Sequence, residues 1–430
     1  MTERSHVRSR FVLVAFTFIV IAYSLMDNIA PRGVLYWRMT FALFYVALVA
    51  VASYALFAIR RSEAYSHATY YAFFVFLYFS FIYGLTAEEF YAIYFFGDFA
   101  LISTILLMIF ILSRTIALID MRYVFLVSSA LILASFLSYL SSRLNLVPAH
   151  DYGPRFDAPK AFAYAGLAVC IARGRGWMRM ASVALIAAAV VLAFLSTWRA
   201  ELGFVGVAIA YALTRYSVLH QGRLLTVIAC MLGAVLVISQ FGSIYGFLND
   251  SLEETRFSTL LQGGGDESFG NRILEVIDVL TVFRTEASLM QWLFGFGHGA
   301  VYMPVYSFPE PNITEGFFVH NIHISLIMFL YRYGMLGAAL YLAFCYLSVQ
   351  RVVRSVFTRK FAFVEEFSCL FAFLITLRSI FYSPVNDPVN IIGISLFLFV
   401  LMRSPAGDRT EDRAKDRMGD RVGAGMARRA

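Results

Sequence analysis

Long apolar stretches alternate with short polar connections along almost the whole chain. Half of them hold roughly 18 to 25 residues, which as a helix matches a hydrocarbon core about 30 Å thick. This pattern predicts an all-α, polytopic integral membrane protein with twelve transmembrane helices. The predicted helices lie at residues 11–26, 34–59, 69–86, 91–112, 123–140, 160–172, 178–196, 201–215, 224–241, 321–349, 361–380 and 389–402.

One long polar interruption, residues 242–320, separates the ninth predicted helix from the tenth. Of all residues, 60% are apolar and only 15% are charged, a composition that a soluble domain does not have. This composition supports a single transmembrane domain over residues 1–403. Residues 404–430 alternate Arg and Asp with few apolar residues. We expect this tail to be disordered and cytoplasmic.

Basic residues are distributed unevenly among the connections. If the N-terminus is cytoplasmic, most of the 35 Lys and Arg fall in cytoplasmic connections and the tail, as the positive-inside rule requires. The predicted topology therefore has both termini in the cytoplasm, and residues 242–320 on the opposite side of the membrane.

The long loop contains a predicted helix of its own. Apolar residues recur at helical spacing after Asn271, which predicts an amphipathic helix at the membrane surface. With Asn271 as its cap, Arg272 would stand in the first turn, where unpaired backbone N–H groups favour a phosphate. The apolar positions are Ile273, Val276, Ile277, Leu280 and Phe283.

Several kinds of chemistry have no sequence signal. The chain has three lysines and no GxxxxGK[ST] motif, so an ATP-driven pump is not indicated. No HExxH motif is present, and His320 and His323 have no evident third metal ligand. We therefore expect a mechanism without a metal or other cofactor.

Arginine and histidine remain as the candidate chemistry at the outer face. Arg199 lies where the seventh predicted helix ends, and Arg272, His298, His320 and His323 lie in or beside the long loop. The planar, permanently charged guanidinium group suits diphosphate oxygens. An imidazole with a pKa near neutrality can take a proton from an attacking hydroxyl. These residues predict an anionic, lipid-linked substrate.

Four motifs follow one another between residues 190 and 345: STWRAELGF, GNR, LFGFGHG, and HN followed by GxxG. In this order they resemble the O-antigen ligase and polymerase family. The resemblance implies transfer of a glycan from undecaprenyl diphosphate to an acceptor hydroxyl, at the periplasmic face of the bacterial inner membrane, without metal or nucleotide sugar. It also implies that Arg199 and Arg272 bind the diphosphate while His320 activates the acceptor.

The identity of the catalytic histidine stays open. Asn321 and Gly334 are separated by twelve residues, where the family usually has nine. Counting back from Gly334 leads to His323 instead. An insertion of about one helical turn would keep either histidine on a similar helix face.

The acceptor is open as well: a lipid-linked repeat for a polymerase, the lipid A core for a ligase. Polymerases of the family often carry an arginine and a glycine with ten residues between them, and Arg155 with Gly166 and Arg284 with Gly295 match this. The match favours a polymerase of O-antigen or exopolysaccharide, with Arg155 and Arg284 as further diphosphate ligands. A transporter of lipid-linked sugars is another alternative, because Asp98 and Arg332 fall within predicted spans.

Overall fold

The computed structural model describes residues 3–29, 34–58, 92–143, 160–195, 199–220, 267–305, 324–358, 361–379 and 388–402, together with Val319, Ile322 and a few positions between 75 and 85. Within these ranges the protein is helical and contains no strand, as the sequence predicts. The one β-type contact among them is an isolated bridge between Tyr302 and Val319.

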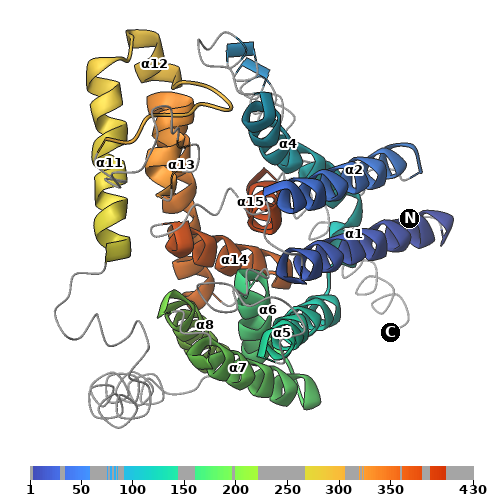
Figure 1. Cartoon of the computed structure of the whole chain (residues 1–430). Helices are drawn as coiled ribbons and strands as arrows, with labels where there is room; N and C mark the ends of the chain where they lie inside the picture. The colour runs from blue at the N-terminus through green and yellow to red at the C-terminus, as the bar shows by residue number, and fades with distance from the viewer. Residues whose placement is uncertain are drawn as a thin grey trace, which may run out of the picture.

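Figure 1 shows α11 and α13 side by side, with α12 across one end of the pair. The remaining helices lie to the right of α13 and below it in this view, and of these α14 and α8 contact α13. The helices are α1 (Glu3–Ile29), α2 (Val34–Ala58), α4 (Ala92–Thr115), η1 (Ile116–Leu118), α5 (Met121–Arg143), α6 (Lys160–Arg173), α7 (Trp177–Leu195), α8 (Arg199–Leu219), α11 (Glu267–Thr285), α12 (Leu289–Phe294), α13 (Ser325–Phe357), α14 (Phe363–Ser379) and α15 (Pro388–Met402).

Ten of the twelve predicted stretches coincide with helices. The stretch at 224–241 and most of 69–86 lie outside the described residues. Two helices, Tyr94–Leu118 and Ser325–Phe357, are long and apolar enough to cross a membrane. The twelve-span topology therefore stays a prediction, while the all-helical class of the described residues is confirmed.

Helix α6 lies at the centre of the bundle. It contacts α5, α7, α8 and α14, and nearly all its residues are buried. Small side chains make this possible, because Gly166 lies directly against Val124 and Ser128 of α5, where a Cβ atom would collide. Close backbone approach over small residues is typical of helices packed in membranes.

A buried ionic cluster joins four helices at one end of this bundle. Arg215 Nε and Nη2 lie 3.0 and 3.1 Å from the two carboxylate oxygens of Glu366, and Arg173 Nε lies 2.5 Å from Glu366 Oε2. Arg215 also donates to the carbonyl oxygen of Val356. This Glu366 cluster gathers the ends of α6, α8 and α13 with the first turn of α14. Helices α6, α8 and α14 contact one another. At their ends away from the Glu366 cluster lie Lys160, Arg199 and Arg378.

Helix α13 is interrupted at Gly334, whose φ of 63° and ψ of −161° are not helical. The chain folds back at this residue. The Phe329 and Tyr341 rings stack with centroids 5.1 Å apart, although twelve residues of straight helix would separate them by about 18 Å. Gly337 likewise lies against the carbonyl oxygen of Phe329. The helix is therefore a hairpin with a short arm, residues 325–333, and a long arm, residues 335–357.

The prediction of one continuous helix over residues 321–349 is accordingly wrong. Nine helical residues extend about 13 Å, and the 23 residues of the long arm extend about 34 Å. Only the long arm matches the thickness of a membrane. The late GxxG motif has a structural role here, since Gly334 makes the turn and Gly337 lets the two arms touch.

Replacing Gly334 by alanine is expected to destabilise the protein by at least about 1–3 kcal/mol, because a side chain strains this backbone conformation. The new Cβ would also meet the backbone of Leu293 and Gly295. Thermal unfolding of the purified protein measures the loss. The matched control is Gly203→Ala in α8, where nothing lies within 4 Å of the added Cβ. That control should be neutral or stabilising, and equal melting temperatures for both variants would contradict the role of Gly334.

Candidate functional site

The loop at residues 295–305 completes the hydrogen bonding of the interrupted helix. In a continuous helix, the carbonyls of Tyr331 and Arg332 would accept from the N–H groups of Met335 and Leu336. The break at Gly334 removes these donors. The N–H of Phe296 donates to Tyr331 O at 2.8 Å instead, and the N–H of Gly297 donates to Arg332 O at 2.9 Å. An apolar surrounding makes such replacement necessary, because an unpaired buried carbonyl is costly.

The glycines of the FGFGHG sequence are explained by this contact. Gly295 lies against the backbone of Arg332 and Tyr333, and Gly299 lies against the backbone of Phe95 in α4. Both have positive φ angles, 78° and 77°, which strain any residue with a Cβ atom. The loop is thus packed between α13 and α4 by backbone contacts.

A buried ion pair joins the same three elements. Arg332 Nη1 lies 2.7 Å from Asp98 Oδ1, and the N–H of Gly299 donates to Asp98 Oδ2 at 2.8 Å. Both side chains are almost fully buried, Arg332 in the short arm of α13 and Asp98 in α4. The sequence singles out these two charges for a transport pathway, whereas in the fold they neutralise each other and hold the loop.

His298 lies beside this ion pair in an aromatic enclosure. The rings of Phe95, Phe99 and Tyr333 surround it edge-on, with centroids 5.4 to 6.2 Å from the imidazole. Its Nδ1 lies 3.2 Å from the Tyr333 hydroxyl, and its Nε2 has no hydrogen-bond partner among the residues that the structure describes. Burial lowers the pKa of His298 to about 4, with Asp98 opposing the shift and Arg332 adding to it. The imidazole is neutral at physiological pH.

This depressed pKa predicts a pH-dependent stability. The unfolded chain binds a proton near the ordinary pKa of 6.5, whereas the folded protein does so only near 4. Stability is therefore complete above pH 6.5 and falls as the pH drops toward 4, by at most about 1.4 kcal/mol per pH unit from this group. Melting temperatures between pH 4.5 and 8 measure the effect. His298→Gln should have a flatter profile, and an unchanged profile would exclude His298 as its source.

The predicted catalytic histidines, His320 and His323, lie outside the described residues, as does Asn321. Their neighbours are described. Val319 exchanges two backbone hydrogen bonds with Tyr302, at 2.8 and 3.0 Å, and Ile322 is buried. Helix α13 begins only at Ser325. Both histidines precede Ser325 in the sequence, and the expectation that either would share a helix face lies outside the described residues.

The segment that follows the histidines leads to the end of the bundle opposite the Glu366 cluster. Ser325 interacts with the hydroxyl of Tyr341 in the long arm, and Tyr341 is hydrogen-bonded to Ser379 in the last turn of α14. Ser325 and Ser379 are both buried. Two hydroxyl contacts thus connect the beginning of α13 to the end of α14.

Helix α11 differs from its prediction at the beginning. It starts at Glu267, so Asn271 is not its cap and Arg272 is its sixth residue. The N–H groups without intrahelical partners are those of residues 267–270, and an acidic residue at the first position suits the helix dipole. The placement of Arg272 in the first turn, beside unpaired N–H groups, is therefore wrong.

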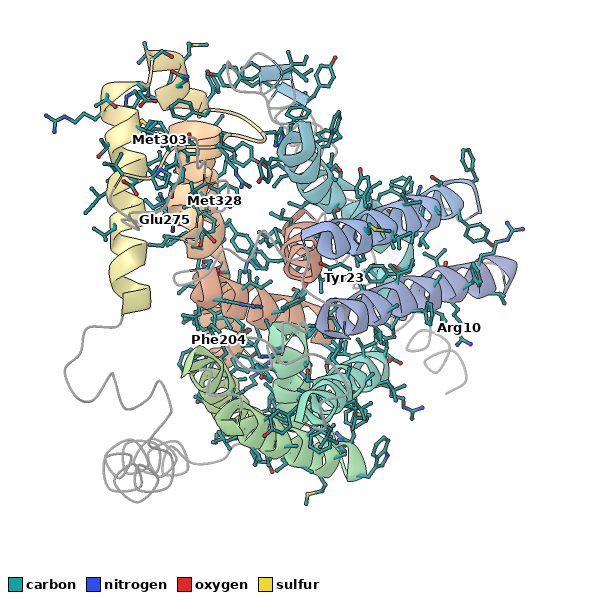
Figure 2. All side chains as sticks on the ribbon, viewed as in Figure 1. Arg10, Tyr23, Phe204, Glu275, Met303 and Met328 are labelled. Atoms are coloured by element: carbon teal, nitrogen blue, oxygen red, sulfur yellow. The ribbon has the colours of Figure 1, made fainter. Side chains whose placement is uncertain are left out.

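The faces of α11 are also reversed in part. Phe283 is buried as expected, but Ile277 and Leu280 are exposed, while Val279 and the acidic residues Glu275 and Asp278 are buried. Asp278 turns inward because its Oδ1 accepts a hydrogen bond from the N–H of Val305 at 2.9 Å. Figure 2 shows Glu275 on the side of α11 that faces α13. The exposed apolar positions form the outer face of the helix.

The four predicted arginines lie in different parts of the protein, and one of them lies outside the described residues. Arg284 is exposed in the last turn of α11. Arg272 is the sixth residue of α11. Arg199 is the first residue of α8, at the end opposite the Glu366 cluster, and Arg155 lies outside the described residues. The two arginines implied by the family resemblance therefore belong to different helices, α11 and α8.

No model of a known protein family matches the chain, and no curated protein matches it either.

Proposed function

We propose that the chain is a polytopic enzyme of the bacterial inner membrane that transfers a glycan between lipid-linked or lipid-anchored substrates. The donor is a glycan on undecaprenyl diphosphate, and the acceptor is a hydroxyl group presented at the periplasmic face. Polymerisation of an O-antigen or exopolysaccharide is the preferred reaction, with ligation to the lipid A core as the alternative. The enzyme is a glycosyltransferase that requires no metal.

One observation carries this proposal: segments far apart in the sequence are joined around the histidines. Asp278 connects α11 to the loop through Val305, and Tyr302 connects the loop to Val319, the residue before His320. On the far side of the histidines, Ser325 and Tyr341 lead to the end of α14. Helix α14 in turn contacts α8, whose first residue is Arg199 and whose Arg215, near the other end, bonds to Glu366. The elements that carry or adjoin the four motifs thus contact one another directly or through α14, which supports the proposal.

The proposed chemistry needs a base and a bound leaving group. The acceptor oxygen attacks the anomeric carbon of the donor glycan, the bond from that carbon to the diphosphate breaks, and undecaprenyl diphosphate leaves. The hydroxyl proton passes to the imidazole of His320 or His323. Arg199 and Arg272 stabilise the charge that develops on the diphosphate.

A chromosomal deletion tests the function and distinguishes its two forms. A polymerase deletion should leave one repeat on the lipid core and abolish the ladder of longer glycans. A ligase deletion should remove all repeats from the core while lipid-linked polymer accumulates. Loss of a secreted polysaccharide with unchanged O-antigen would assign the enzyme to exopolysaccharide synthesis.

Reconstituted vesicles separate the enzyme from a transporter. The purified protein, supplied with lipid-linked repeats, should lengthen or transfer the glycan and release undecaprenyl diphosphate. If lipid crossed the bilayer while the glycan length stayed constant, transport would be the function. The buried pair of Asp98 and Arg332 would then be the first place to seek its pathway.

A further inference from the structure

A chain of hydroxyl groups runs from the beginning of α13 to the end of α14. Ser325 interacts with the hydroxyl of Tyr341 in the long arm, and Tyr341 is hydrogen-bonded to Ser379. Ser379 donates to the carbonyl oxygen of Thr376 at 2.6 Å. Both serines are buried, where a hydroxyl needs hydrogen-bond partners. The Tyr341 hydroxyl thus joins the two buried serines.

The end of this chain sets the direction of its hydrogen bonds. A serine hydroxyl has one hydrogen, and that of Ser379 is directed at the carbonyl of Thr376, which can only accept. Ser379 Oγ therefore accepts from the Tyr341 hydroxyl, and the Tyr341 oxygen is left to accept from Ser325. Hydrogen bonds that run in one direction strengthen one another. Removing the Tyr341 hydroxyl would break the chain in its middle.

Tyr341 contacts the short arm of α13 at two successive turns. Its ring stacks on Phe329, with centroids 5.1 Å apart and 17° between the planes. Its hydroxyl reaches Ser325, four residues earlier on the same face of that arm. Ile324, just before the helix, provides no side-chain cap. The contact with Tyr341 therefore anchors the beginning of the short arm.

Three anchored residues follow one another at intervals of three around the predicted catalytic histidines. Val319 is bonded to the loop through its backbone, Ile322 is almost fully buried, and Ser325 is held by the hydroxyl chain. His320 and His323 directly follow the first two in the sequence. The position of a general base matters, because a displacement of about 1 Å can lower the rate about 10²-fold.

We infer that Tyr341 is a positioning residue for the proposed glycan transfer, which holds the histidine segment, residues 319–325, in place through Ser325. This inference rests on the proposed function and adds to it a residue that contacts neither donor nor acceptor. The acceptor proton still passes to an imidazole, and Tyr341 determines where that imidazole stands. Loss of its hydroxyl therefore affects turnover rather than donor binding.

Steady-state transfer by the full-length protein in nanodiscs tests this role. Tyr341→Phe removes only the hydroxyl and should lower kcat by about 10- to 100-fold, with an unchanged KM for the lipid-linked donor. Ser325→Ala should act alike, and the double variant should lose no more than either single one, because both remove the same contact.

The matched control is Tyr211→Phe. The Tyr211 hydroxyl lies 3.0 Å from Ser355 Oγ in the long arm of α13, beside Glu366 and therefore at the end of α14 away from Ser379. The control removes the same kind of contact between hydroxyl groups and should keep the wild-type kcat. A tenfold loss in the control would show a general effect of such contacts and overturn the positioning role.

Amide hydrogen exchange provides a readout that does not need activity. Residues 319–328 should exchange faster in Tyr341→Phe than in the wild type and in Tyr211→Phe. Unchanged kcat in both Tyr341→Phe and Ser325→Ala would overturn the positioning role and leave the proposed function standing. A wild-type protein without glycan transfer would refute that function, and faster exchange in the variant would then show a structural contact only. Should Tyr341→Phe fail to fold, the kcat of Ser325→Ala decides.

Discussion

Replacing Arg332 by alanine is expected to destabilise the protein by about 3–5 kcal/mol, because a buried charge then loses its partner. Asp98 would keep the hydrogen bond from the N–H of Gly299 but lose its ion pair with Arg332. The loop between α4 and α13 would lose its ionic support at the same time. Thermal or denaturant unfolding of the purified protein measures this loss.

A double variant separates the effect of losing the ion pair from the effect of losing the packing of the Arg332 side chain. Asp98→Asn with Arg332→Met removes both charges, retains an oxygen acceptor for Gly299, and should recover much of the stability. Arg354→Ala, at an exposed position of the long arm, is the control and should change stability little. If the double variant were as unstable as Arg332→Ala alone, packing rather than charge pairing would explain the effect.

Replacing the catalytic histidine is expected to lower glycan transfer by about 10²–10⁴-fold, the range typical of a general base. His320→Ala should show the loss while the protein still folds, since the backbone bonds of Val319 to Tyr302 do not involve the imidazole. Transfer by the purified enzyme, followed as release of undecaprenyl diphosphate, measures the rate. Binding of the donor should persist, because in the proposed mechanism the arginines rather than the histidine contact the diphosphate.

Matched variants decide between the two histidines. If His323→Ala loses activity and His320→Ala keeps it, the base is His323. Full activity of both would refute general-base catalysis by this segment. His220→Ala, an exposed histidine at the far end of α8, controls for the substitution itself. Arg272→Ala should weaken donor binding as well as transfer, which distinguishes a diphosphate ligand from a base.

The helices themselves follow from the sequence because long apolar stretches have few alternatives in an apolar surrounding. The hairpin in α13 does not follow from this pattern. Residues 325–357 form one apolar segment in the sequence, and hydropathy alone does not indicate that the chain reverses its direction within it. Gly334 and Gly337 were the available signal, since a glycine pair inside an apolar helix indicates close backbone contact.

The inner face of α11 could not be predicted for a related reason. Periodicity assigns apolar residues to the buried side, but Asp278 is turned inward by a backbone N–H that lies 27 residues later in the chain. The pair of Asp98 and Arg332 spans 234 residues. Two opposite charges in apolar segments are recognisable in a sequence, whereas their contact depends on how the helices pack.

At the break in α13, N–H groups of the loop replace the helical donors to the carbonyls of Tyr331 and Arg332. This replacement limits how the sequence of the loop can change in evolution. An insertion between Gly295 and Tyr302 would shift the donors away from the carbonyls of Tyr331 and Arg332, so related chains should keep the length of this stretch. Gaps in an alignment of homologues should therefore be absent from this stretch, and the spacing from Gly295 to Tyr302 should serve as a marker of common descent.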